Sequence, residues 1–174
     1  MQTKTLFLLL LYGLLTLSSL RIGLAQSRTS EWRSYGGDEG GTRYSTLNQI
    51  NRANVSSLKR AWTYHTGELE LGLKTADFQA SFSSTPLVID GVMYISTPSS
   101  RVIALNAETG SEIWKFDPQA NKPRREFNSH RGVAYWENQA RTDRRILFGT
   151  VDGHLIALNA ASGKPISAFG ENGF

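Results

Sequence analysis

Few side chains in this sequence could carry catalysis by themselves. The three histidines are His65, His130 and His154, and none of the 174 residues is a cysteine. His65 and His154 fall in strand-like patterns, and the charge of Arg131 disfavours protonation of its neighbour, so we interpret His130 as a polar lining residue rather than a base. The missing cysteines exclude thiolate metal sites and cysteine nucleophiles. No HExxH, P-loop or Gly-x-Ser-x-Gly motif suggests another chemistry.

Basic residues gather in two stretches, 122–125 and 141–145. Both are interrupted by proline or acidic residues, which favours solvated loops; the alternative is a patch that binds polyanions. The formal net charge is +4, and about +2 without Lys4 and Arg21, which lie in the N-terminal leader described below. This charge is too small to indicate nucleic-acid binding.

An internal repeat is the clearest guide to the fold. Residues 94–110 match residues 147–163 without a gap at an offset of 53, and Phe116 and Phe169 keep the same spacing. A period near 50 residues with about four short strands per unit is typical of β-propeller blades. The glycines, aromatic residues and Val/Ile/Thr segments also favour strands. We therefore predict an all-β fold of the propeller class.

Each unit is predicted to alternate strands and turns. The first unit has strands at 92–96, 101–106 and 111–116, separated by turns at 98–100 and 108–110. The second repeats this pattern through turns at 152–153 and 162–165. Residues 59–66 alternate like a strand of a partial unit before both, and Asn54 is expected to open a short helical turn that runs to Leu58.

The turn that closes the second strand carries a motif with a mechanical explanation, Ala104-x-Asn106-x-x-Thr109-Gly110-x-x-x-Trp114. A small alanine leaves room for a neighbouring sheet, the asparagine bonds its own turn, and glycine takes the positive φ. The tryptophan is then expected to lie flat between blades. In the second unit Ser162 replaces the threonine and Ser167 the tryptophan, which predicts a weaker contact.

Residues 1–25 are typical of an export signal. Lys4 supplies a positive charge, residues 5–20 are almost wholly apolar, and Gly23-Leu24-Ala25 has the small-x-small pattern of a cleavage site. We expect a periplasmic or secreted chain that begins at Gln26, with an association with the membrane left open. The alternative is an uncleaved anchor, but the apolar run is shorter than the ~20 residues that span a bilayer.

Several segments, in order, resemble the opening of pyrroloquinoline quinone (PQQ) dependent dehydrogenases of the quinoprotein glucose and alcohol dehydrogenase type. One of them is the turn motif that ends at Trp114, called the docking motif below. The others are Trp32-x-x-Tyr35-Gly36-Gly37-Asp38, Gly41-x-Arg43-Tyr44-Ser45, Ala61-Trp62-x-x-x-Thr66-Gly67, Thr85-Pro86-Leu87-Val88-x-Asp90-Gly91 and Arg131-Gly132-Val133-Ala134-Tyr135-Trp136.

The resemblance implies an eight-bladed propeller, of which residues 26–174 would form the N-terminal part, about three blades. It also implies PQQ on the propeller axis beside Ca²⁺, a sugar, polyol or alcohol as substrate, and a membrane quinone or cytochrome c as electron acceptor. The alternative is a non-enzymatic propeller scaffold of the bacterial envelope, which would need only the docking motif.

By the same resemblance, Arg131 is expected to contact PQQ, since a guanidinium binds carboxylates with a fixed fork of donors. Its other interpretation is a surface arginine paired with an acid. Thr150 matches a hydroxyl donor of the family, or is an ordinary strand threonine. Ser83 stands where the family places a Glu or Gln that contacts the cofactor, and Gln79 fills that role if the segment has moved upstream.

The family's cysteine pair before the matching arginine is replaced here by Phe127-Asn128-Ser129-His130. This departure resembles the glucose, sugar or polyol branch more than the methanol branch. The resemblance places the calcium ligands and the catalytic base beyond Phe174, so no catalytic or metal residue is assigned in this chain. Expressed alone, the chain is expected to be inactive.

Overall fold

The computed structural model describes residues 31–68, 70, 74–75, 78–79, 82–119, 131–150 and 152–174. By its internal contacts the chain divides into two units. One contains residues 1–30 and Ser45–Leu47, within which the N–H of Leu47 donates to Ser45 Oγ at 3.2 Å. The other contains Glu31–Tyr44 and Asn48–Phe174 and holds the sheets described below. Residues 1–25, predicted to be an export signal, lie outside the described residues.

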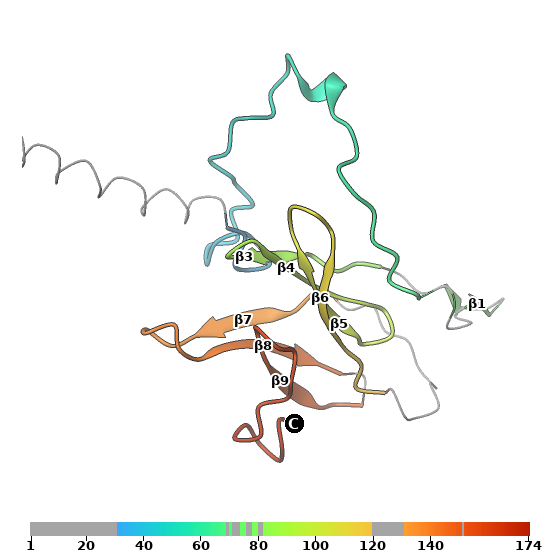
Figure 1. Ribbon diagram of the computed structural model, residues 1–174, viewed down its shortest axis with the longest axis vertical. Helices are drawn as coiled ribbons and strands as arrows, with labels where there is room; N and C mark the ends of the chain where they lie inside the picture. The colour runs from blue at the N-terminus through green and yellow to red at the C-terminus, as the bar shows by residue number, and fades with distance from the viewer. Residues whose placement is uncertain are drawn as a thin grey trace, which may run out of the picture. The chain divides into compact units, whose positions relative to one another are not determined.

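The first sheet is a four-stranded antiparallel meander (Figure 1). Its strands, in order, are β3 (Leu87–Ile89), β4 (Val92–Ser96), β5 (Val102–Asn106) and β6 (Glu112–Phe116). The predicted strands of the first unit are thus confirmed, although β5 and β6 each begin one residue later than expected. The reason is turn closure: the carbonyl of Arg101 accepts the N–H of Thr97 at 2.9 Å, and that of Ser111 accepts the N–H of Asn106 at 2.9 Å.

The second sheet has three strands, β7 (Ala134–Glu137), β8 (Arg144–Gly149) and β9 (Leu155–Asn159). The prediction of a further strand after the turn at 162–165 is wrong, because the described residues there form only an isolated bridge between Leu158 and Pro165. Proline has no N–H to continue a ladder. The chain also turns back, so that the N–H of Ala157 donates to the carbonyl of Gly173 at 3.0 Å. A separate small pair joins β1 (Lys74–Thr75) to β2 (Phe78–Gln79).

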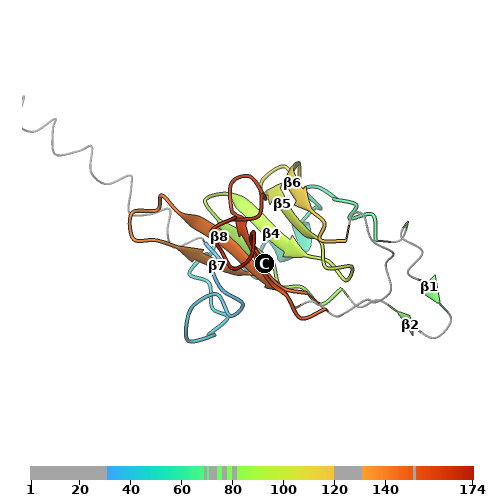
Figure 2. The same cartoon turned by 90° about the horizontal axis from the view of Figure 1, so that it is seen from below.

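The main core lies between these two sheets, whose strands run beside each other in Figure 2. Alternate residues of each strand point to it, as the period of two in a strand requires. From the first sheet come Leu87, Ile89, Tyr94, Val102, Ala104 and Trp114, and from the second Ile146, Phe148, Ile156, Leu158 and Ala160. The repeat therefore builds two layers with one apolar interior, as expected for neighbouring blades.

The other face of the first sheet carries a smaller cluster of Ile95, Ile103 and Leu105. Trp62 and Tyr64 pack against this cluster. Residues 61–66 alternate between exposed and half-buried side chains, as predicted, but they are not a strand, since no partner strand pairs with them among the described residues. The segment is an extended cover over that face.

The tryptophan docking predicted from sequence is confirmed. Trp114 is 9% exposed, and its Nε1–H donates to the carbonyl of Ala160 in the next unit at 3.0 Å. The indole lies against Gly163, where a Cβ would come within 2.5 Å of the ring. Trp62 repeats this arrangement one unit earlier: it donates to the carbonyl of Ala107 at 3.2 Å and lies against Gly110.

The helical turn expected at Asn54 is a short 3₁₀ helix, η3 (Val55–Ser57). Asn54 precedes it but makes no side-chain cap. Its Oδ1 instead accepts the N–H of Asn51 at 2.8 Å, and its Nδ2 donates to the carbonyl of Gln49 at 2.7 Å. The asparagine therefore closes the preceding loop. Among the described residues, no helix is long and apolar enough to cross a lipid bilayer.

Candidate cofactor-binding site

An open hollow of about 570 Å³ lies where β7 begins and β8 ends. Arg131, Gly132 and Thr85 contribute its polar rim, and Tyr35 of the N-terminal segment, residues 31–44, also lines it. The rest of its wall is mostly apolar and is formed by Val133, Ala134, Leu147, Phe148, Gly149 and Leu155. One arginine beside an apolar wall suits a planar, negatively charged ligand.

Arg131 is exposed at this hollow. Its carbonyl accepts the N–H of Thr85 at 3.0 Å, which fixes the main chain while the guanidinium is left for other contacts. Within the described part of the chain, no carboxylate pairs with that guanidinium. The interpretation of Arg131 as a surface arginine paired with an acid is therefore not supported.

Thr150 lies in a different and smaller hollow, of about 80 Å³. Its hydroxyl donates to the carboxylate of Asp152 and accepts the N–H of His154 at 3.1 Å. The hydrogen bond from Thr150, followed by that from His154, lowers the pKa of Asp152. A hydroxyl has one proton to donate, so Thr150 offers none to a cofactor while it is bound to Asp152. The structure does not bring Thr150 together with Arg131 in one hollow.

Gln79 and Ser83 are the two candidates for the position at which the family places a Glu or Gln that contacts the cofactor. Gln79 is in β2, and its side chain lies outside the described part of the structure. Ser83 is exposed and is not among the described residues that line the hollow of Arg131. The Oγ of its neighbour Ser84 accepts the N–H of Ser96 at 3.2 Å.

The histidines differ in their surroundings. His154 is half exposed and lies 3.2 Å from a carboxylate oxygen of Asp152, with the ring of Phe174 edge-on to it. His65 is exposed in the cover segment. His130 and Phe127 lie outside the described residues, as does the basic stretch 122–125.

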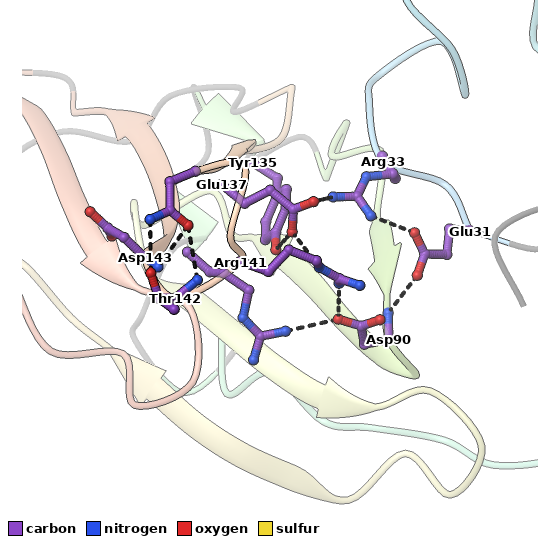
Figure 3. A network of polar contacts seen from close by, with 10 residues as sticks. Glu31, Arg33, Asp90, Tyr135, Glu137, Arg141, Thr142 and Asp143 are labelled. Carbon is purple, nitrogen blue, oxygen red and sulfur yellow. Dashed lines mark hydrogen bonds and ion pairs between the residues drawn. The ribbon is translucent and has the colours of Figure 1, made fainter. Parts of the chain in front are cut away.

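The basic stretch 141–145 forms an internal network rather than a free patch (Figure 3). Arg141 and Arg144 both donate to one oxygen of Asp90, at 2.5 and 2.8 Å, and Arg145 donates to Asp143 at 2.5 Å. These contacts neutralise the cations, so the polyanion-binding alternative loses its support here.

The same network reaches the N-terminal segment. Glu137 accepts from Arg33 at 2.8 Å and from Arg141 at 3.0 Å, and Glu31 accepts the N–H of Asp90 at 3.2 Å. The N-terminal segment is thereby held to both sheets, and Trp32 pairs with Val88 on the free edge of β3. Sequence reasoning missed these partners, because charges separated by more than 40 residues leave no periodic signal.

A second missed feature is a buried ion pair between Glu68 and Arg101, which are 8% and 7% exposed. Glu68 also accepts the N–H and hydroxyl of Ser99, at 3.0 and 2.8 Å, and Nε–H of Arg101 at 3.0 Å. A buried pair is tolerated when its hydrogen bonds are satisfied, as they are here. This pair ties the end of the cover segment to the turn between β4 and β5.

The residues of the larger hollow fit PQQ in part. Arg131, which has no carboxylate partner among the described residues and lies next to apolar walls, provides the donor set that a carboxylated aromatic ring needs. Arg131 therefore fits a carboxylate of the cofactor, whereas the hydroxyl of Thr150 already donates its proton to Asp152. Among the described residues, no group of three His, Asp or Glu side chains could hold a metal ion.

Two stacked sheets joined by tryptophan–glycine docking define blades of a β-propeller. The family model described as glucose/ethanol/alcohol dehydrogenase, beta-propeller domain, matches residues 32–174. The chain belongs to this family of PQQ-dependent quinoprotein dehydrogenases.

Relatives with different printed names match the chain to a similar degree. Quinohemoprotein alcohol dehydrogenase of Comamonas testosteroni is 39% identical over 145 residues, covering 80% of this chain and 18% of the relative. Quinoprotein glucose dehydrogenase A of Acinetobacter calcoaceticus is 35% identical over 162 residues, covering 83% and 20%. Quinate/shikimate dehydrogenase (quinone) of Acinetobacter baylyi is 35% identical over 162 residues, covering 82% and 19%.

Solved structures agree with the propeller assignment. The crystal structure of the Comamonas testosteroni quinohemoprotein alcohol dehydrogenase matches with a TM-score of 0.63 and 38% identity, covering 85% of this chain and 20% of that one. A quinohemoprotein alcohol dehydrogenase of Pseudomonas putida matches with a TM-score of 0.60 and 36% identity, covering 76% and 18%. The chain thus spans about a fifth of the length of the relatives it matches.

Proposed function

We propose that the protein is a PQQ-dependent dehydrogenase that oxidises a CH–OH group of a sugar, polyol or alcohol. The chain described here would supply part of the propeller and a carboxylate-binding arginine, Arg131. One observation carries the proposal: in a chain of this family, Arg131 lies at a hollow with no acid of the described residues paired to it. In that position the guanidinium is available to a carboxylate of the cofactor.

PQQ, when bound, supplies the two-electron acceptance that alcohol oxidation needs. The contribution of this chain is position and charge. The guanidinium of Arg131 would bind a cofactor carboxylate with two parallel hydrogen bonds. The apolar side of the hollow, which includes Leu147 and Leu155, would cover one side of that ion pair and so reduce its screening by water.

The glucose, sugar or polyol branch is the finer part of the proposal. It is supported by Phe127-Asn128-Ser129-His130, which stands where the resemblance would place a cysteine pair. We further propose that Ca²⁺ accompanies PQQ on ligands outside this chain, and that a membrane quinone or cytochrome c accepts the electrons. Export, with cleavage after Ala25, would bring the protein to the periplasm or the exterior.

The test uses the full-length protein, prepared without PQQ and then reconstituted with PQQ and Ca²⁺. Dye-linked oxidation of glucose, sorbitol, ethanol and quinate should depend on added PQQ and fall when Arg131 is replaced in R131M. R131K should retain part of the activity, because an ammonium keeps the charge but loses the fork. A folded protein that neither binds PQQ nor oxidises any of the four compounds would instead be a propeller scaffold.

A further inference from the structure

The main chain at Arg131 is hydrogen-bonded to the residues that lead into the first sheet. The N–H of Thr85, just before β3, donates to the carbonyl of Arg131 at 3.0 Å. This is the one backbone bond that joins the entry of β3 to the entry of β7 among the described residues. It therefore fixes the point from which the Arg131 side chain departs.

Gly132 makes this close approach possible. Its φ is +138°, in the region that side-chain-bearing residues rarely adopt, and an added Cβ would stand 3.0 Å from the carbonyl oxygen of Thr85. The atom it would meet is backbone, which has no rotamer by which to move aside. Both the conformation and the contact therefore require glycine at this position.

A second set of contacts holds the far ends of the same strands. Asp90, which follows β3, binds Arg141 in the turn after β7 and Arg144 at the start of β8. That anchor consists of flexible, partly exposed side chains, whereas the tie at Thr85 is main chain against main chain. Only the tie at Thr85 adjoins Arg131.

We propose that Thr85 and Gly132 are positioning residues that set the Arg131 guanidinium at the wall of the hollow in the geometry that binds a PQQ carboxylate. This inference rests on the proposed function. Bidentate binding depends on orientation, so a displaced arginine loses most of the contact even though its charge remains nearby. Gly132→Ala would push the chain away from Thr85 and so misdirect the side chain.

The experiment measures PQQ affinity of the full-length protein by tryptophan fluorescence at several salt concentrations. R131M is expected to raise the Kd about tenfold or more, the range for loss of a charged hydrogen bond. G132A should raise the Kd by a similar factor but keep more of the salt dependence than R131M does, because the displaced guanidinium still carries its charge near the hollow. The double variant should bind no more weakly than R131M alone, since both changes remove one contact.

Gly91→Ala is the matched control. Gly91 has a φ of +75° with no atom within 4 Å of an added Cβ, and it lies in the turn after Asp90 at the opposite end of β3. This variant also places a side chain at a positive φ, without a clash, and should keep the native Kd. If G132A does not fold, T85G loosens the same tie without a clash and should still raise the Kd several-fold. Because Thr85 also lines the hollow, the double variant with R131M is needed: it should bind no more weakly than R131M if T85G acts through Arg131.

Two outcomes separate the inference from the function on which it rests. If R131M binds PQQ normally, the proposed function of Arg131 fails. If R131M loses affinity while folded G132A and T85G bind normally, or if G132A and R131M are additive in the double variant, the positioning role fails and the proposed function stands.

Discussion

The indole of Trp114 lies against Gly163, and the two residues join the first sheet to the second. The glycine has a φ of +69°, and an added Cβ would stand 2.5 Å from the ring. The absence of a side chain at residue 163 is therefore what allows the tryptophan to lie flat between the units.

Trp114→Ala is expected to destabilise the fold by about 3–5 kcal/mol, the usual scale for removal of a large buried aromatic. Trp32→Ala should cost less, because Trp32 is only half buried and its two bonds to Val88 use the main chain. Denaturant midpoints of the two variants of the full-length protein check the order. A larger loss for Trp32→Ala would refute the docking role of Trp114.

Gly163→Ala tests the same contact from the other side. The substitution adds a clash with Trp114 to the strain of a positive φ, and we expect a loss of about 2–5 kcal/mol. Gly153→Ala is the control, because its φ is +84° but no atom lies within 4 Å of an added Cβ. That variant should lose only the strain, about 1–2 kcal/mol. Equal losses in thermal or denaturant unfolding would show that the ring does not press on Gly163.

The internal repeat carried most of the fold prediction. It located the strands around Tyr94 and Leu105 and the docking of Trp114, because each unit repeats the same turn chemistry and the same apolar alternation. It failed at Pro165, since residues 164–169 match the outer strand in spacing but a proline and a reversal of the chain replace the ladder. Spacing reports a repeat, whereas pairing depends on available N–H groups.

The candidate site was less accessible to sequence reasoning. Arg131 could be identified by resemblance, and its place at a hollow agrees with that expectation. The hydrogen bond from Thr150 to Asp152 could not be predicted, because the partner of a hydroxyl depends on the local backbone conformation, which the sequence does not show. The ties of Thr85 to Arg131 and of Asp90 to Arg141 and Arg144 join distant segments, for which a single sequence holds no signal.

The charge network of Figure 3 predicts acid sensitivity. Burial acts to raise the pKa of Glu137, but hydrogen bonds from Tyr135 and Arg141 and the charge of Arg33 outweigh it, so its pKa is lowered. A carboxylate with a lowered pKa stabilises the fold above its unfolded pKa, about 4.3 for glutamate, and that contribution is lost as the pH falls through the folded pKa.

We therefore expect the free energy of unfolding to fall between about pH 5 and pH 3, and to fall less in E137Q, by no more than about 1 kcal/mol. Glu108→Gln is the control, because among the described residues the exposed side chain of Glu108 forms no ion pair. Urea unfolding at pH 7 and pH 4 gives both values for each protein. If the free energy of unfolding of E137Q depends on pH as strongly as that of the unchanged protein, Glu137 does not contribute to the acid sensitivity.

If residues 1–25 are an export signal, as the sequence predicts, they should be removed on export. Lys4, the apolar run and Gly23-Leu24-Ala25 should direct cleavage, so that the mature chain in the envelope fraction begins near Gln26. Mass spectrometry of that fraction measures the N-terminus directly, and lysine substituted into the apolar run should leave the uncleaved form in the cytoplasm. A mature, exported species that still begins with Met1 would contradict the cleavage.

The most direct measurement of the central claim is a crystal structure of the full-length protein with PQQ bound. We predict that two nitrogens of the Arg131 guanidinium lie about 2.7–2.9 Å from the oxygens of one PQQ carboxylate, beside the walls formed by Leu147 and Leu155. PQQ bound away from this hollow, or Arg131 paired with a carboxylate of the protein while the cofactor is present, would contradict the account.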